Sequence, residues 1–570
     1  MIKIKDNQIF QVFRGIQYRD LIISILLLVL ISIPNNYTLL YSSDLQNNLI
    51  MKVAYIMMST LVYLILMVIL GVKNFFRLGI VFILLGPLEI IFLKSTGMPI
   101  TAGFIDAIIN TNRSETFEQI QSNITIIIST VVIFLIYIIL LSKLNNFKIN
   151  STLKFIIIGC FIAFNGVVFI QMFKINNNDR ITLKTKLEIS KSTTIIKYEK
   201  IFPVNLFINT FKTYETRSNI NKMSKDLEGF YFNASSARSS EEEEIYILII
   251  GETARYQNFG INGYSRNTTP FLSQNKNLVS YSNVYSGAIL TSISVPQIIT
   301  RATPEESNIQ FKEKSISEAF KEAGYYSSWI ANQSLTNPLI QRISKNIDHS
   351  YFTESKTHFN NNYDINTFDE LQKVLQKPHK KKFIVIHTYG SHYRYSNRYP
   401  KEFEKFRPAI SQIGYDNISY ENKESLVNAY DNTILYTDFF IDKVIKEVES
   451  KNTISALVYL SDHGENLYDD ERRYILHGSD TPIKYEYHIP FIIWTSNEYQ
   501  KKYADEYKNI LDNRNKKVAS TNTFYTLLNM AGINYKNSDK EIDKSVASPL
   551  YKEPIQRKLI TGSNEIINVP

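Results

Sequence analysis

The chain has 570 residues, of which 44% are apolar, and a formal net charge of +9. This length allows more than one domain, and the apolar residues are unevenly spread, because the first 175 residues hold several long apolar runs. The single cysteine, Cys160, lies inside one of these runs, so no disulfide can form within the chain. No basic–aromatic cluster suggests a nucleic-acid site, and the positive charge favours anionic surfaces instead.

Five runs approach the length of about 20 apolar residues that a membrane-spanning helix needs. We expect spans at roughly 21–40, 50–72, 76–93, 124–141 and 155–173. The first run is the least regular, because Pro34, Asn35 and Asn36 interrupt it. A buried core helix could explain any one run but fits five in succession poorly. A cleaved signal peptide also fits poorly, since no small-residue cleavage site follows the first run.

Basic residues in short loops predict the orientation of the spans. They occur in the N-terminal arm and after the second and fourth runs, whereas the segment between the first two runs has no Lys or Arg. We therefore expect a cytoplasmic N-terminus, and an odd number of spans then places the rest of the chain outside. The predicted domains are a transmembrane domain of five helices over 1–175, a connector with surface helices over 176–243, and an exported domain over 244–570.

The exported part alternates between strand-like and helix-like segments. Continuous apolar runs of strand length occur at 245–250, 325–330, 383–386, 454–460 and 489–494. Helical patterns occur at 315–323, 426–448 and 521–530, and a short amphipathic piece lies at 204–211. Strands that are apolar on both faces and alternate with helices predict an α/β domain with a largely parallel sheet sandwiched by helices. In such sheets, ligands bind beyond the carboxyl ends of the strands.

Potential metal ligands follow two of the predicted strands. Glu252 comes directly after the first strand, and Asp462 and His463 come directly after the fourth. Carboxylate and imidazole groups together suit a cation such as zinc. Each motif also has a purely structural explanation, because Glu252 could satisfy backbone donors at a helix start and an Asp–His pair could be a structural ion pair.

Further histidines follow the same strand ends. His392 comes after the third strand, and His477 lies a short loop beyond the Asp–His pair. His387 and His488 are further candidates. A lone histidine is usually structural, but five of the chain's eight histidines fall at or near predicted strand ends. That clustering favours a functional site.

Hydroxyl groups gather in the stretch LTSISVP at 290–296. At a helix start they could act as caps, or one of them could be a nucleophile. A threonine hydroxyl is a weak nucleophile unless a metal or a base lowers its pKa. A zinc ion held by the three candidate ligands would do so, with the hydroxyl as the fourth ligand. These residues alone do not choose among Thr253, Thr291, Ser292 and Ser294.

Together the motifs resemble those of the phosphoethanolamine transferases of bacterial envelopes, which belong to the sulfatase and alkaline-phosphatase superfamily. The resemblance covers nearly the whole chain, from the five spans through the connector to a hydrolase-like exported domain. The order and spacing of the motifs make it specific. The matching stretches are GETARYQNFGINGYSRNTTP (251–270), LTSISVPQIITRAT (290–303), IHTYGSHYRYSNRYP (386–400), YDNTILYTD (430–438) and SDHGENLYDDERRYILHG (461–478).

The resemblance implies roles for individual residues. It makes Thr291 the nucleophile and places His392 and His477 around the transferred phosphate, where they could serve proton transfer or a second metal. It gives Asn332 and Gln333, after the second strand, as substrate-binding residues, although the lysine that the lipid A-modifying members carry near this place is absent. The residues that the resemblance assigns to zinc are Glu252, Thr291, Asp462 and His463.

The implied activity is transfer of phosphoethanolamine from phosphatidylethanolamine to a lipopolysaccharide or lipooligosaccharide acceptor, on core sugar or lipid A. It would proceed through a covalent phospho-threonine. The implied location is the bacterial inner membrane, with the catalytic domain in the periplasm. Lipid A-modifying members usually carry exported disulfides, which this chain lacks, and its segment at 300–304 looks more like the branch that acts on core heptose.

Three alternatives remain. A sulfatase of the superfamily needs a modifiable Cys or Ser in a C/S-x-P-x-R motif, but Cys160 lies in a predicted span and the stretch from Ser294 lacks the arginine. A phosphoglycerol transferase would differ in only a few pocket residues. A non-catalytic envelope protein would commonly have lost a metal ligand, yet all the candidate ligands are present.

Overall fold

The computed structural model describes residues 17–42, 49–111, 113–175, 197–333, 346–353, 363–413 and 418–570. The chain divides into two compact units. The first comprises Met1–Ala102 and Asn123–Lys212, and the second comprises Gly103–Ser122 and Thr213–Pro570. The predicted domain limits at 175 and 243 stay predictions. The segment Gly103–Ser122, which lies between the apolar helices α5 (Val72–Thr96) and α8 (Ile124–Lys143) in the sequence, belongs to the second unit.

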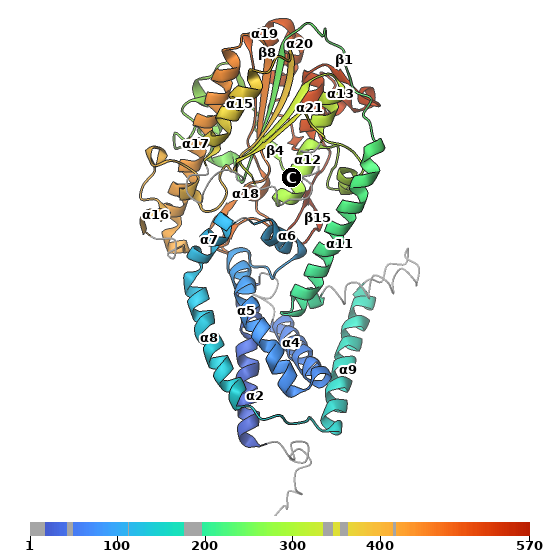
Figure 1. The fold of residues 1–570 in the computed structure, drawn as a ribbon, viewed down its shortest axis with the longest axis vertical. Helices are drawn as coiled ribbons and strands as arrows, with labels where there is room; N and C mark the ends of the chain where they lie inside the picture. Colours follow the sequence, from blue (N-terminus) through green and yellow to red (C-terminus); the bar gives the residue numbers. More distant parts are fainter. Residues whose placement is uncertain are drawn as a thin grey trace, which may run out of the picture. The chain divides into compact units, whose positions relative to one another are not determined.

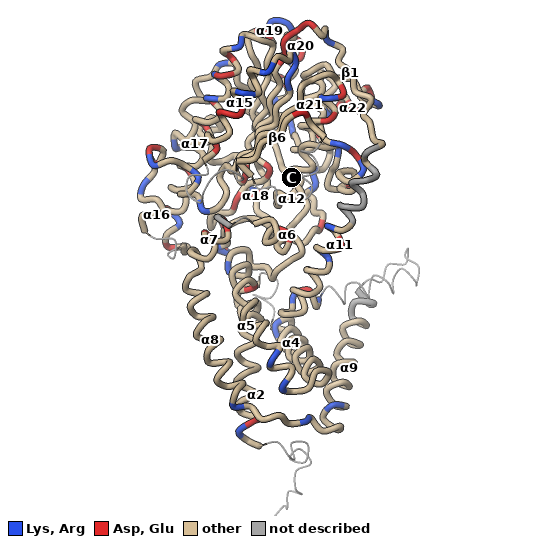
Figure 2. The backbone as a smooth tube through the Cα atoms, in the orientation of Figure 1, with Lys and Arg blue, Asp and Glu red and all other residues tan. Residues whose placement is uncertain are grey.

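The first unit is built from long apolar helices. Four of them are long and apolar enough to cross a membrane. They are α4 (Leu49–Leu70), α5 (Val72–Thr96), α8 (Ile124–Lys143) and α9 (Ser151–Ile175). The helices α2 (Tyr18–Ile31) and α3 (Ile33–Tyr41) meet at an angle of 47° and give a fifth span if they are counted as one. Charged residues are sparse along these helices (Figure 2). With the bent pair counted as one, the five apolar helices of the predicted fold are present. The bend lies beside Pro34, which is in the first turn of α3.

Buried polar side chains tie the first unit together. The Asn35 amide donates to the hydroxyl of Tyr63 over 2.9 Å and to the carbonyl of Phe202 over 2.8 Å. Its oxygen accepts from the hydroxyl of Tyr55 over 2.7 Å and from the N–H of Phe202 over 3.0 Å. All of these partners lie in the first unit. The asparagine that interrupts the first apolar run therefore links α3, α4 and the residues before α11.

The first part of the predicted connector, 176–196, lies outside the described residues, as do Lys3, Lys5 and Arg14 of the N-terminal arm. The short amphipathic piece predicted at 204–211 is the start of a longer helix, α11 (Val204–Asp226). Asn205 in its first turn donates to the carboxylate of Glu89 in α5, which also accepts from the N–H of Ile100. A buried carboxylate in a span is thus satisfied by the connector.

The second unit contains a seven-stranded sheet in the order β3-β11-β8-β2-β7-β5-β6. β8, β2, β7, β5 and β6 are parallel, whereas β11 is antiparallel to β8, and β3 is antiparallel to β11. The prediction of a largely parallel sheet is confirmed. The antiparallel direction of the strand at 489–494 was not predicted, and neither were the two outermost strands, β3 and β6. The strands are β2 (Glu244–Gly251), β3 (Leu278–Ser280), β5 (Tyr326–Ala331), β6 (His349–Phe352), β7 (Lys381–His387), β8 (Ile454–Ser461) and β11 (Phe491–Thr495).

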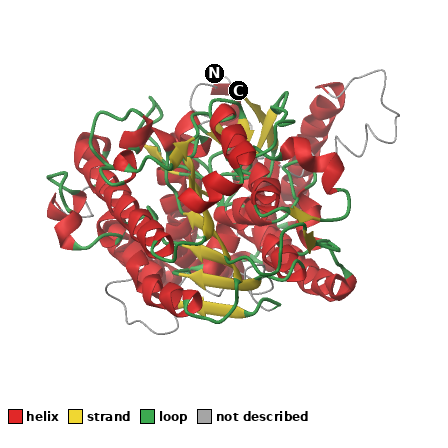
Figure 3. Cartoon of the chain, turned by 90° about the horizontal axis from the view of Figure 1, so that it is seen from above, coloured by secondary structure: helices red, strands yellow, loops and turns green. Residues whose placement is uncertain are grey.

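Helices cover both faces of this sheet (Figures 1 and 3). Alternate residues of β2 enter two separate cores, because successive side chains of a strand point to opposite faces. One core is covered by α12 (Thr291–Ile299), α13 (Ile316–Glu322), α19 (Asn497–Lys502), α20 (Ala504–Asp512) and α21 (Asn522–Met530). The other is covered by α15 (Phe368–Leu375), α16 (Ile410–Ile413) and α17 (Lys423–Glu449).

The remaining elements of the second unit are short. Four two-stranded ribbons lie outside the main sheet. They are β1 (Ser235–Ser236) with β13 (Ile533–Asn534), β4 (Val284–Tyr285) with β12 (Val518–Ala519), β9 (Asn466–Leu467) with β10 (Ile475–Leu476), and β14 (Arg557–Ile560) with β15 (Ile566–Val569). The other helices are α6 (Ala102–Asn110), α7 (Arg113–Ser122), α18 (Lys484–Tyr487) and α22 (Ser538–Glu541).

Candidate metal centre and active site

Two neighbouring parallel strands bring the predicted metal ligands together. Gly251, the last residue of β2, lies opposite Ser461, the last residue of β8. The next residues are Glu252 on one side and Asp462 and His463 on the other, so the chain register places all three at one edge of the sheet. One ligand atom from each lies within 4.8 Å of the others, and all three residues are buried.

Hydrogen bonds fix the direction of each ligand. Oδ1 of Asp462 accepts the backbone N–H groups of Thr253 and His463, whereas its buried Oδ2 has no hydrogen-bond partner among the described residues. Nδ1 of His463 donates to the carbonyl of Gly464 over 2.9 Å. Its Nε2 then lies 3.4 Å from Oε1 of Glu252 and 3.3 Å from Oδ2 of Asp462, so this nitrogen is the one turned toward the two carboxylates.

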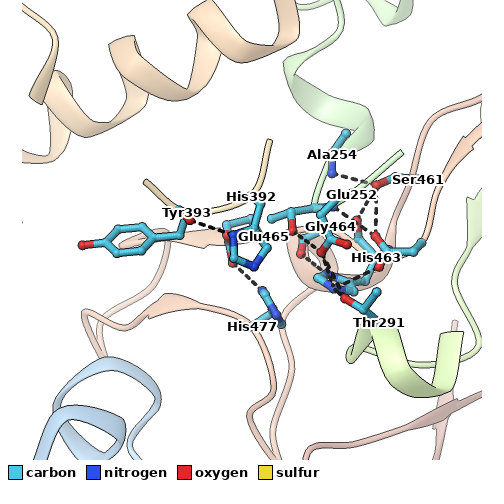
Figure 4. A network of polar contacts seen from close by, with 12 residues as sticks. Glu252, Ala254, Thr291, His392, Tyr393, Ser461, His463, Gly464, Glu465 and His477 are labelled. Atoms are coloured by element: carbon cyan, nitrogen blue, oxygen red, sulfur yellow. Dashed lines mark hydrogen bonds and ion pairs between the residues drawn. The ribbon is translucent and has the colours of Figure 1, made fainter. Parts of the chain in front are cut away.

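Thr291 is the hydroxyl residue that completes this cluster. It is the first residue of α12, and its Oγ1 lies 3.0 Å from Oε1 of Glu252 and 3.1 Å from Nε2 of His463 (Figure 4). The free N–H groups at a helix start favour an anionic ligand. Of the other candidate nucleophiles, Thr253 donates to Glu252, and the Ser294 hydroxyl is buried within α12.

The backbone beside the cluster is constrained. Thr253 has a φ of +63°, a left-handed conformation that is unusual for a β-branched residue and typical of functional sites. Gly390 has a φ of +50°, and a Cβ there would come within 2.8 Å of the backbone N and O of Glu252. The loop after β7 therefore needs glycine to approach the cluster so closely.

The donor set fits a zinc ion. Two carboxylates, one imidazole and one hydroxyl make the four ligands of a tetrahedral zinc centre. The buried Oδ2 of Asp462 has no hydrogen-bond partner among the described residues and lies 3.3 Å from Nε2 of His463, so one cation could bind both atoms. Buried lone pairs of this kind need a proton or a cation between them.

The electrostatics of the cluster support this fit. Burial and the charge of Glu252 raise the pKa of Asp462 to about 7. Burial works against the charged form of His463, but Asp462 and Glu252 outweigh it and raise the pKa of His463 to about 10. Burial also works against ionised Glu252, yet the hydrogen bond and charge of His463 outweigh it and lower the pKa of Glu252. Two buried carboxylates thus share the single positive charge of protonated His463. A bound divalent cation would supply two positive charges at the same place.

His477 lies against this cluster. Its ring centroid is 4.0 Å from that of His463, and its Nδ1 lies 3.0 Å from Oε1 of Glu465. Burial and the charge of His463 lower the pKa of His477 well below its usual range. Burial raises the pKa of Glu465 to about 8, and the hydroxyl of Tyr395 donates to its second oxygen over 3.0 Å.

His392 is held by the loop that follows β7. Its Nδ1 donates to the carbonyl of Tyr393 over 2.7 Å, which leaves Nε2 available (Figure 4). The loop itself is supported by Asp364, whose carboxylate accepts the N–H groups of Tyr389 and Gly390 over 2.7 and 3.0 Å. Sequence reasoning missed Asp364, because it is far from any predicted strand end and only its hydrogen bonds reveal its role.

The two residues predicted to bind substrate have different surroundings. Asn332 is fully buried, and its amide is engaged by Asp364 over 2.9 Å and by the hydroxyl of Thr353. Gln333 donates to the carbonyl of Thr388 over 2.9 Å and lies 3.4 Å from Oε2 of Glu252. Substrate contact by either residue stays a prediction, and these partners place Gln333 nearer the metal ligands.

The two further histidine candidates occupy other positions. His387 is fully buried, packs edge-on against Trp329, and neither of its ring nitrogens has a hydrogen-bond partner among the described residues. His488 lies between Gln257 and the carbonyl of Ser282 and stacks on Tyr256. These contacts give His488 a structural role in holding neighbouring loops together.

Residues 244–533, just over half of the chain, match the sulfatase family model. The chain belongs to the sulfatase family. Phosphoethanolamine transferase EptC of Escherichia coli (strain K12) is 31% identical over 324 residues, 55% of each protein, so the chain spans about half the length of this relative.

Solved structures show the same fold. The crystal structure of the C-terminal periplasmic domain of EptC from Escherichia coli, in complex with Zn, is 29% identical, with a TM-score of 0.53 over 59% of this chain and 95% of that one. The integral membrane protein lipooligosaccharide phosphoethanolamine transferase A from Neisseria meningitidis is 20% identical, with a TM-score of 0.74 over 94% of this chain and 99% of that one. The second match extends the common fold into the apolar helices.

Proposed function

We propose that this protein transfers phosphoethanolamine from phosphatidylethanolamine to a lipopolysaccharide-type glycolipid through a covalent intermediate on Thr291. The observation that carries the proposal is the convergence of the Thr291 hydroxyl with Glu252, Asp462 and His463 at the carboxyl edge of the sheet. The similarity to a phosphoethanolamine transferase at 31% identity supports the transferred group.

In the first proposed step, Oγ1 of Thr291 attacks the phosphorus of the donor. The new Thr291 O–P bond replaces the bond from phosphorus to the diacylglycerol oxygen, and diacylglycerol leaves with a proton. In the second step, an acceptor hydroxyl or phosphate oxygen attacks the same phosphorus and releases Thr291. The N-terminal N–H groups of α12 would hold the phosphoryl oxygens.

Zinc bound by Glu252, Thr291, Asp462 and His463 would supply positive charge that lowers the pKa of the threonine hydroxyl and neutralises developing negative charge. The Zn complex of the relative's periplasmic domain supports the choice of ion. His392 and His477 would move protons to and from the leaving and attacking oxygens, since each keeps Nδ1 occupied by a protein oxygen.

The apolar helices fit this chemistry, because the donor lipid does not leave the bilayer. We place the protein in the bacterial inner membrane with the catalytic unit in the periplasm. The acceptor would be a core sugar such as heptose, or lipid A. The segment at 300–304 resembles the branch of the family that acts on core heptose, which supports a core sugar as the acceptor.

Release of labelled diacylglycerol from defined vesicles tests the proposal. The full-length protein in detergent should act on phosphatidylethanolamine, and Thr291→Ala should abolish release, whereas Ser292→Ala on the same helix should retain it. Equal release from phosphatidylglycerol would point to a phosphoglycerol transferase instead. Mass spectrometry of envelope glycolipids with and without the gene would then identify the acceptor, and no phosphoethanolamine-sized difference would contradict the proposed acceptor class.

A further inference from the structure

The loop that carries His392 is contacted by a helix from a distant part of the sequence. α7 lies between two apolar helices in the chain, yet its residues belong to the same compact unit as this loop. Polar side chains of α7 make the contacts. Glu115 accepts from the hydroxyl of Tyr389, Glu118 pairs with Arg398 and Asn397, and Gln121 and Ser122 accept from Arg394.

Arg398 is the centre of these contacts. Its side chain is 4% exposed, and its Nη2 lies 2.5 Å from Oε2 of Glu118. The same guanidinium donates from Nε to the carbonyl of His392 and from Nη2 to the carbonyl of Tyr393, each over 2.9 Å. A buried guanidinium needs a paired anion, and Glu118 supplies that anion.

The carbonyl of Tyr393 connects this pair to the active site. It accepts the Nδ1 proton of His392 over 2.7 Å, in addition to the proton from Arg398. A carbonyl that accepts the Nδ1 proton fixes the tautomer of a neutral imidazole, because the proton stays on Nδ1 and the lone pair is on Nε2. Arg398 thus fixes the two backbone carbonyls on which the orientation of the His392 ring depends.

We infer that Glu118 is a positioning residue for His392 and acts through Arg398. This inference rests on the proposed function only in giving His392 a part in the reaction. It makes the segment between two apolar helices a structural part of the active site, so that the periplasmic domain without α7 would hold His392 less firmly. Glu118 itself touches neither the metal ligands nor Thr291 in the contacts of the described residues.

The test compares Glu118→Gln, Arg398→Gln and the double variant in the full-length protein. Glu118→Gln keeps the side-chain volume but removes the charge and one of the two acceptor oxygens. Glu404→Gln is the matched control, because Glu404 pairs with Arg407 in the same region without contacting His392. The readouts are the rate at which diethyl pyrocarbonate labels His392, resolved by peptide mass spectrometry, and kcat and KM for diacylglycerol release.

We expect Glu118→Gln to raise the His392 labelling rate on the order of tenfold, the change in population that follows from losing one charged hydrogen bond. We expect kcat to fall by about tenfold with KM for the donor unchanged. In the Arg398→Gln background, Glu118→Gln should add nothing, since residues that act through one another are not additive. Glu404→Gln should match the wild type in both readouts.

Two results would overturn the inference. One is a lower unfolding midpoint in Glu118→Gln with unchanged His392 labelling and kcat, which would make the pair merely structural. The other is full additivity in the double variant. Labelling does not depend on turnover, so a wild-type protein that released no diacylglycerol would refute the proposed function and leave the positioning role to be decided by the labelling rates.

Discussion

Protonation of His387 should destabilise the second unit in mild acid. The ring is fully buried, neither ring nitrogen has a hydrogen-bond partner among the described residues, and burial lowers its pKa from 6.5 to about 4. Between these two values the unfolded chain binds the proton and the folded chain does not, so stability rises with pH. The stabilisation is fully present above pH 6.5 and is lost as the pH falls to 4. A shift of this size corresponds to about 3 kcal/mol.

The replacement His387→Phe tests this magnitude. It keeps an aromatic ring edge-on against Trp329 and removes the titrating group. The chain's two tryptophans, Trp329 and Trp494, are both fully buried in the second unit, so tryptophan fluorescence in a urea titration follows the unfolding of this unit in the full-length protein.

The free energies of unfolding of the two proteins should diverge by about 3 kcal/mol between pH 7 and pH 4, with the variant losing less. Carboxylates that titrate in the same range affect both proteins equally and cancel in the difference. Parallel curves would refute the reasoning, because they would mean that His387 is protonated in the folded protein or has a partner that accepts its charge.

Three further outcomes follow from the structure. Zinc at 100 times its Kd should stabilise the metal-free second unit by about 2.7 kcal/mol in the same urea titration, and Asp462→Asn should abolish this gain; an equal gain in the variant would exclude Asp462 as a ligand. Gly390→Ala should cost about 1–3 kcal/mol and weaken zinc binding, because its Cβ would meet the backbone of Glu252 at 2.8 Å; unchanged zinc affinity by calorimetry would contradict this. Asn35→Leu should destabilise the first unit by about 2 kcal/mol, since four hydrogen bonds of about 0.6 kcal/mol each are lost; the thermal midpoint in detergent should fall, while tryptophan-monitored unfolding of the second unit should not change.

Strand-end chemistry was predictable from sequence because it is local. Apolar runs place β2 and β8, and parallel strands put Glu252 and Asp462 at the same edge of the sheet. Periodicity does not encode strand direction, so the antiparallel pairing of β11 could not be read from an apolar run. Residue types alone left four candidate nucleophiles, and the family resemblance pointed to Thr291. The distances then place the Thr291 hydroxyl beside Glu252 and His463.

The residues that hold the His392 loop in place come from distant parts of the sequence and could not be predicted from it. Asp364 holds the loop before His392, and Glu118 holds the arginine after it, yet neither lies near a motif. α7 reads as a polar segment between two predicted spans, and nothing in its pattern indicates that it joins the second unit. Such contacts depend on the fold of the whole unit, in which residues about 280 positions apart in the sequence become neighbours.

The central claim is that Thr291 carries the transferred group. Zinc-loaded full-length protein, incubated with phosphatidylethanolamine and no acceptor, then acid-quenched and mapped by peptide mass spectrometry, tests it most directly. The account predicts a phosphoethanolamine-sized increment on Thr291 that is absent in Thr291→Ala and disappears when acceptor glycolipid is added. An increment on another residue, or one that persists in Thr291→Ala, would contradict it.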